Sequence, residues 1–97
     1  MLLPVNRPPL SPDQIAAGRR LGIALRAARG DRSQAEIALA AGISPETLRK
    51  IEGGRLPTPA FGTVVCLSEV LGVPVAELAE IWLTGAPAGA IGLTKSR

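Results

Sequence analysis

The side chains in this sequence that could do chemistry favour binding over catalysis. The 97 residues include no histidine, no tyrosine and one cysteine, Cys66. These absences remove the usual general base, most metal sites and any cysteine–histidine nucleophile pair. The carboxylates are spread over separate predicted helix surfaces. We therefore expect no enzyme, no cofactor and no metal site, and we interpret Cys66 as a small core residue and not as a redox sensor.

Charged residues are unevenly distributed along the chain. Residues 1–57 hold nine Lys and Arg against five Asp and Glu, a net of +4, whereas residues 58–94 hold three Glu and no cation, a net of −3. A basic first half suits a polyanion such as nucleic acid. Surface arginines of a helical protein are also commonly just solvated, so charge alone leaves both interpretations open.

Length and composition bound the class of protein. A chain of 97 residues is one small domain whose core is too thin for a deep cofactor cavity. A single cysteine cannot close an intrachain disulfide, and no leader segment opens the chain. The longest apolar stretches fall far short of the ~18 residues that a membrane span needs. We therefore expect a cytoplasmic protein with no membrane partner.

Proline and capping signals mark the opening of the chain. Prolines at positions 4, 8, 9 and 12 each fix φ and remove a backbone donor, which predicts an extended N-terminal arm over residues 1–13. Ser11, followed by Pro12 and Asp13, is typical of a helix N-terminus. The first helix is expected to run to about Arg29, because a glycine follows it.

Two short helices come next with almost no linker between them. Ser33 and Glu36 form a capping-box pattern that begins the second helix. Ser44 and Pro45 begin the third. Since Gly42 and one further residue alone separate them, the two helices must cross at a steep angle.

The remaining chain predicts two more helices and a tail. The fourth helix is expected to begin at Thr58 or Pro59 and the fifth at Pro74. The folded domain spans residues 14–83, and the Gly/Ala-rich segment 84–97 is expected to be flexible, or ordered only against a partner chain. The residues predicted to face the core, helix by helix, are Ile15, Leu21, Leu25 and Ala28; Ile37, Ala38 and Ala41; Leu48 and Ile51; Phe61, Val64, Val65, Ser68 and Leu71; and Val75, Leu78, Ile81 and Trp82.

The stretch QAEIALAAGISPETLRKIEG, from Gln34 to Gly53, meets the packing requirements of a helix-turn-helix. A small residue, Ala38, stands where the second helix would cross the first, and Gly42 tolerates the positive φ of the turn. Apolar side chains supply the inner faces, and the positions left outside are Pro45, Glu46, Arg49, Lys50 and Glu52.

The string SQAEIALAAGISPETLRKIEGGRLPTP, followed by an apolar helix and LGVPVAEL, resembles the Xre/Cro-like helix-turn-helix family of bacterial and phage regulators over residues 15 to 83. The resemblance implies an all-α, five-helix, repressor-like DNA-binding domain with the helix-turn-helix at its second and third helices. It also implies a sequence-specific transcriptional regulator, by expectation a repressor, that binds double-stranded DNA as a homodimer. One departure is Asp31 and Arg32, an apparent one-residue extension where the family has an apolar residue.

The family's base-contacting positions, transferred to this sequence, are Pro45, Glu46 and Lys50, flanked by Thr47 and Arg49. Lys50 can donate to guanine, Glu46 can accept from cytosine, and Pro45 can touch a thymine methyl group. Glu46 can equally be a first-turn acid that complements the helix dipole.

The resemblance also implies phosphate contacts and one structural ion pair. Gln34, at the start of the second helix, is expected to bind a DNA phosphate, with a plain surface glutamine as the alternative. The full set of expected phosphate-binding residues is Ser33, Gln34, Ser44, Arg55 and Thr58. Arg26 and Glu52 are expected to form an ion pair between the first and third helices.

A protein-binding module is the alternative function from a different class. Such a protein would be antitoxin-like: it would sequester a partner protein, contacted through residues 84–97, and would bind DNA for autoregulation. Trp82 is expected to cover the edge of the core, and its alternative is a dimer contact together with Leu83 and Ile91.

Overall fold

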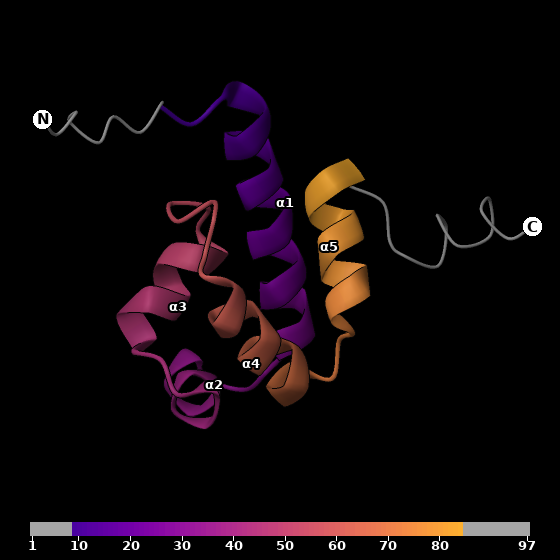
Figure 1. Cartoon of the computed structure of the whole chain (residues 1–97). Helices are drawn as coiled ribbons and strands as arrows, with labels where there is room; N and C mark the ends of the chain where they lie inside the picture. The colour runs from indigo at the N-terminus through magenta and orange to yellow at the C-terminus, as the bar shows by residue number, and fades with distance from the viewer. Residues whose placement is uncertain (1–8, 85–97) are drawn as a thin grey trace, which may run out of the picture.

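The computed structural model describes residues 9–84, which form five α-helices and no strand. The helices are α1 (Pro12–Arg29), α2 (Gln34–Ala41), α3 (Pro45–Glu52), α4 (Phe61–Leu71) and α5 (Val75–Thr84) (Figure 1). The all-α, five-helix prediction is therefore confirmed. The predictions for residues 1–8 and 85–97 lie outside the described residues.

The helix-capping residues predicted from the sequence begin α1 and α2 at the expected positions. Ser11 accepts a hydrogen bond from the backbone N–H of Gln14, and the Gln14 side chain accepts one from the Ser11 N–H, a complete capping box. Because this cap begins α1 at Pro12, the last two residues of the expected arm, Pro12 and Asp13, are helical. Ser33 likewise caps α2 by accepting from the Glu36 N–H at 3.0 Å.

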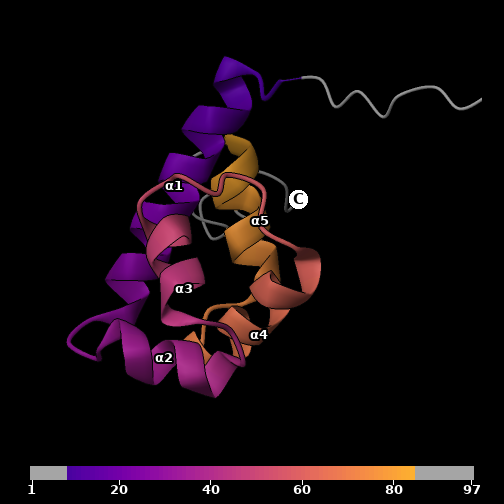
Figure 2. The same ribbon diagram turned by 90° about the vertical axis from the view of Figure 1, so that its left-hand side faces the viewer.

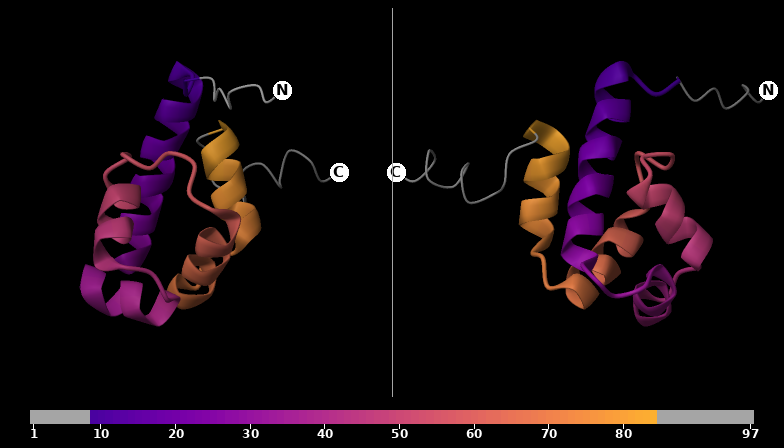
Figure 3. Two further views of the ribbon diagram at one scale, coloured as in Figure 1. Left: turned by 60° about the vertical axis from the view of Figure 1, so that its left-hand side comes forward. Right: turned by 180° about the vertical axis from the view of Figure 1, so that it is seen from behind.

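The long helix α1 stands between α5 and α3, which pack on opposite sides of it (Figures 1 and 3). The pair α2 and α3 forms a steep corner, and α2 also packs on α4 (Figure 2). Gly42 makes this corner possible: it ends α2 in the left-handed region at φ 77°, as predicted. The backbone N–H of Ile43 then donates to the Ala38 carbonyl at 3.0 Å and closes the turn.

The core lies where the five helices meet. Half of the predicted inward residues are buried and most of the others are half-buried. The buried apolar cluster comprises Leu21, Leu25, Ile37, Ala38, Ala41, Leu48, Ile51, Leu67 and Leu78. Ile15 was predicted to be inward but is 37% exposed, because it lies in the first turn of α1, which extends beyond the end of α5 in Figure 1.

The prediction for α4 was wrong in its start and in part of its buried face. The helix begins at Phe61 and not at Thr58 or Pro59, because Pro57 is buried against α1 and the chain stays non-helical up to Ala60. Phe61 is 73% exposed, and Leu67, which the sequence analysis did not assign to the core, is fully buried.

Cys66 is exposed and is not a core residue. It directly precedes Leu67, and consecutive residues of a helix are about 100° apart, so burying Leu67 and Ser68 turns Cys66 toward solvent.

Two glycines bring other parts of the chain directly against the backbone of α1. A Cβ at Gly22 would lie 2.5 Å from the carbonyl oxygens of Ile51 and Glu52, in the last turn of α3. A Cβ at Gly18 would collide with Pro57. The absence of side chains at these two positions sets how closely α3 and the connection after it approach α1.

Candidate nucleic-acid interface

One side of α3 is buried and the other is open. Leu48 and Ile51 are 0% and 1% exposed and anchor the helix to the core. Figure 2 shows α3 in front of α1, at the surface of the molecule. Of the five expected base-contacting residues, Thr47 is half-buried and the others are exposed: Pro45, Glu46, Arg49 and Lys50.

The exposed side of α3 carries one weak ion pair. Lys50 Nζ lies 3.9 Å from Glu46 Oε2, one turn away, and both side chains are largely exposed. An exposed pair of this kind stabilises a helix by only ~0.3–0.5 kcal/mol. Each partner can therefore leave the other for a stronger contact at little cost.

Two of the three expected phosphate-binding hydroxyls, those of Ser33 and Ser44, act as helix caps. Ser44 Oγ accepts from the Thr47 backbone N–H at 3.0 Å and lies 2.9 Å from the Thr47 hydroxyl. Ser33 caps α2 in the same way. Both serines are exposed and stand at helix N-termini, where backbone N–H groups lack intrahelical acceptors and favour an anion.

The ion pair that braces α3 was assigned to the wrong arginine. Arg29, not Arg26, binds Glu52, with Nε 2.7 Å from Oε2 and Nη2 2.9 Å from Oε1. Both arginines lie in the last turn of α1. The guanidinium group of Arg29 contacts the end of α3, whereas Arg26 is exposed. This bidentate geometry fixes the orientation of the carboxylate as well as its distance.

Gln34 joins the same cluster. Its side-chain amide donates to Glu52 Oε1 at 2.8 Å, so α1, α2 and α3 all meet at one carboxylate. This side chain was predicted to bind a DNA phosphate, and its contact with Glu52, 18 residues away, has no local signal in the sequence.

Glu52 is held ionised by this cluster. Burial alone would raise the pKa of the Glu52 carboxyl, but the hydrogen bonds from Arg29 and Gln34 and the nearby positive charges of Arg29 and Arg26 outweigh it and lower the pKa below its ordinary value. The hydrogen bond to Glu52 correspondingly raises the pKa of Arg29. The Arg29–Glu52 ion pair, called the brace below, is thus fully charged at neutral pH.

Arg32, in the segment between α1 and α2 where the resemblance suggested an extension, has a defined role. Arg32 donates to the carbonyl oxygens of Ala28 and Arg29, at 3.1 and 3.3 Å, and caps the end of α1. Arg29 donates in return to the Arg32 carbonyl at 2.7 Å. This segment therefore helps to hold Arg29 in place for Glu52.

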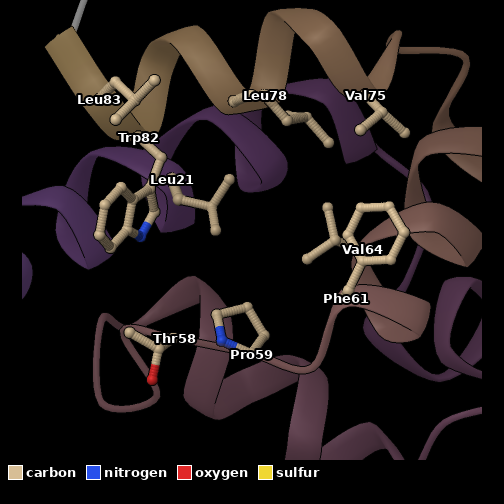
Figure 4. Close-up of a pocket in the computed structure, with 10 residues that line it drawn as sticks. Leu21, Thr58, Pro59, Phe61, Val64, Val75, Leu78, Trp82 and Leu83 are labelled. Atoms are coloured by element: carbon tan, nitrogen blue, oxygen red, sulfur yellow. The ribbon is translucent and has the colours of Figure 1, made fainter.

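The connection from α3 to α4 carries the other two expected phosphate ligands. Arg55 is exposed. Thr58, also exposed, lines an apolar groove of about 330 Å³ between this connection and α5 (Figure 4). Trp82, another lining residue, packs against the core and donates from Nε1 to the Pro57 carbonyl at 3.0 Å, so it covers the core edge as predicted.

A second, polar hollow of about 440 Å³ lies beside the brace. It brings together two exposed arginines, Arg26 of α1 and Arg49 of α3. The sequence gives no local signal for this neighbourhood, because 23 residues separate them. The complete lining is Arg26, Arg29, Gln34, Arg49, Glu52 and Gly53.

The two crossed helices, the glycine turn and the exposed outer side of α3 define the helix-turn-helix class of DNA-binding proteins. A comparison with protein families bears this out: residues 18–81 match a family described as a helix-turn-helix domain, and the chain belongs to that family. A search of curated proteins returns no significant match. Among residues 9–84, no helix is both long and apolar enough to span a membrane.

Proposed function

We propose that the protein is a sequence-specific transcriptional regulator of the Xre/Cro-like type, acting as a repressor, with α3 as its recognition helix in the DNA major groove. The observation that supports this most is the contrast between the two sides of α3. Its inner side is anchored and braced at Glu52, and its outer side presents polar and charged side chains to solvent. A rigid helix with a free polar side is what direct contact with base edges requires.

Base choice belongs to the outer side of α3. Lys50 donates to O6 and N7 of guanine, Glu46 accepts from the cytosine amino group, and Pro45 contacts a thymine methyl group, with Thr47 and Arg49 flanking. Lys50 and Glu46 are already neighbours and only weakly paired, so both are available for bases. The preferred half-site therefore contains G·C pairs.

Phosphate contacts supply most of the affinity and set the register on the duplex. We assign them to the N-termini of α2 and α3 and to Arg55 and Thr58 on the following connection. At α2 the donors are the backbone N–H groups of the first turn and the second N–H of the Gln34 amide, whose other N–H binds Glu52. The N-terminus of α3 contributes through Ser44.

Two copies of the chain bind one operator. A single recognition helix contacts one half-site, and a dimer with two-fold symmetry contacts two half-sites about 34 Å apart on one face of the duplex. Of the expected dimer contacts, Leu83 is 65% exposed and Ile91 lies outside the described residues. The antitoxin-like alternative rests on residues 84–97, of which only Thr84 is described, and it stays a prediction.

Selection of bound fragments from random DNA duplexes tests the proposal. We expect a G·C-containing half-site repeated at a spacing of one helical turn, and affinity that falls linearly with salt on a log–log plot by ~0.9 per neutralised phosphate. Lys50→Ala should relax preference at one base position, whereas Gln34→Ala should weaken all sequences alike. Salt-independent binding, or no enrichment of any sequence, would refute the proposed function.

A further inference from the structure

The polar hollow beside α3 contains more positive charge than its own residues neutralise. Arg29 and Glu52 cancel one another in the two-pronged ion pair, and Gln34 directs its amide to the same carboxylate. Within residues 9–84 neither Arg26 nor Arg49 has a side-chain hydrogen bond or an ion pair. The lining therefore carries a net charge of +2.

The two unpaired arginines come from different helices and share one concave surface. Arg26 projects from α1 and Arg49 from α3, and both line the hollow together with the start of α2. An anion seated between them relieves the repulsion of two like charges and accepts hydrogen bonds from two planar guanidinium groups. The neighbouring carboxylate does not oppose an anion strongly, because Arg29 compensates its charge at 2.7 Å.

We propose that this hollow binds a single DNA backbone phosphate, clamped between Arg26 and Arg49. The inference rests on the proposed function and deepens it, because the hollow adjoins the recognition helix and the N-terminus of α2. It also changes two assignments made from the sequence. Arg26 is a phosphate ligand and not the partner of Glu52, and Arg49 contacts the backbone rather than a base.

Variants that replace each arginine by an uncharged residue test the clamp. Arg26→Gln and Arg49→Gln each remove one positive charge, and Ala76→Glu is the matched control. Ala76 is exposed on α5, on the opposite side of α1 from α3 (Figures 1 and 3), so this change alters net charge equally but far from the hollow. Thermal unfolding checks that all variants fold, and fluorescence anisotropy measures the affinity for a selected and a scrambled duplex at several salt concentrations.

Each arginine variant should bind both duplexes roughly tenfold more weakly than the wild type. The control variant should lose less than about twofold in affinity. Because both arginines hold the same phosphate, the double variant should lose less than the product of the single losses. For the double variant, the slope of log affinity against log salt concentration should be shallower by about 0.9, the value for one phosphate. Base preference should stay unchanged in all variants.

Four outcomes separate this inference from the proposed function. If the wild-type protein binds DNA but the arginine variants match Ala76→Glu, the clamp is wrong and the function stands. If Arg49→Gln changes base preference, Arg49 contacts a base and the clamp is wrong. If titration with inorganic phosphate shifts the side-chain NMR signals of both arginines while DNA affinity is unaffected by the variants, the hollow binds free anions and not DNA. If the wild-type protein binds no DNA, both fail.

Discussion

Replacing Gly22 by alanine should destabilise the protein, although alanine is the better helix former. Gly22 is buried in α1, where α3 crosses it. An alanine Cβ would lie 2.5 Å from two backbone carbonyl oxygens, those of Ile51 and Glu52, and 2.9 Å from the Glu52 carbonyl carbon. Backbone atoms in the last turn of a helix cannot rotate away as a side chain can, so α1 and α3 must separate.

The size of the effect follows from two opposed contributions. Alanine in place of glycine stabilises a helix interior by ~1 kcal/mol. Overpacking of a close helix contact costs ~1–3 kcal/mol, and this contact lies at the severe end because two oxygens are hit at once. We expect the free energy of unfolding to fall by about 2 kcal/mol, which for a domain of this size lowers Tm by roughly 8–16 °C.

Urea and thermal unfolding followed by circular dichroism measure this loss. Gly62→Ala is the control, since Gly62 lies in α4 and a Cβ there would meet no atom within 4 Å. That variant should be as stable as the wild type or more stable by ~0.5 kcal/mol. If Gly22→Ala matched the control, the close approach of α1 and α3 would be refuted, and the position of α3 with it.

Three further changes test other contacts in the structure. Glu52→Gln removes the charge that the hydrogen bonds from Arg29 depend on and should lower the free energy of unfolding at neutral pH by ~2 kcal/mol. Because the folded pKa of Glu52 is lowered, its contribution is present above the ordinary value of 4.5 and is lost as pH falls below it. The difference from wild type in urea unfolding should therefore narrow in acid, and a constant difference would contradict the ionised brace. Arg20→Met removes two hydrogen bonds, at 3.0 and 2.6 Å, to the last carbonyls of α5. It should cost ~1–2 kcal/mol and speed amide exchange in that helix, and unchanged exchange would argue against this cap. Ser68→Ala removes the 2.6 Å hydrogen bond to the Val73 carbonyl and should cost ~1 kcal/mol in the same unfolding assay, whereas a stabilised variant would show that the bond contributes nothing.

Prediction from the sequence succeeded where a feature depends on residues within one helical turn. Ser11, Ser33 and Ser44 cap the three helices that they were expected to begin. Gly42 has the left-handed conformation that the turn needs. The open side of α3 was also predictable, because apolar spacing alone assigns Leu48 and Ile51 to the core and leaves the intervening positions outside.

Prediction failed where a residue's contacts or exposure depend on how the helices pack against one another. Arg26 and Arg29 are both in the second half of α1, and only the crossing of α1 over α3 decides that Arg29 contacts Glu52. Phe61 fits an apolar stripe along α4, but the first turn of α4 lies at the rim of the groove next to α5, so Phe61 is exposed. Each of these outcomes depends on how whole helices are placed.

The sequence by itself determined five helices, the turn at Gly42 and the exposed polar side of α3, because caps, glycines and apolar periodicity act over a few neighbouring residues. Tertiary structure alone decided that three helices share the Glu52 carboxylate, that α3 lies against the bare backbone of Gly22, and that Arg26 and Arg49 line one hollow. These features join residues 18 to 30 positions apart, and their distances are set by the angles and separations at which the helices pack.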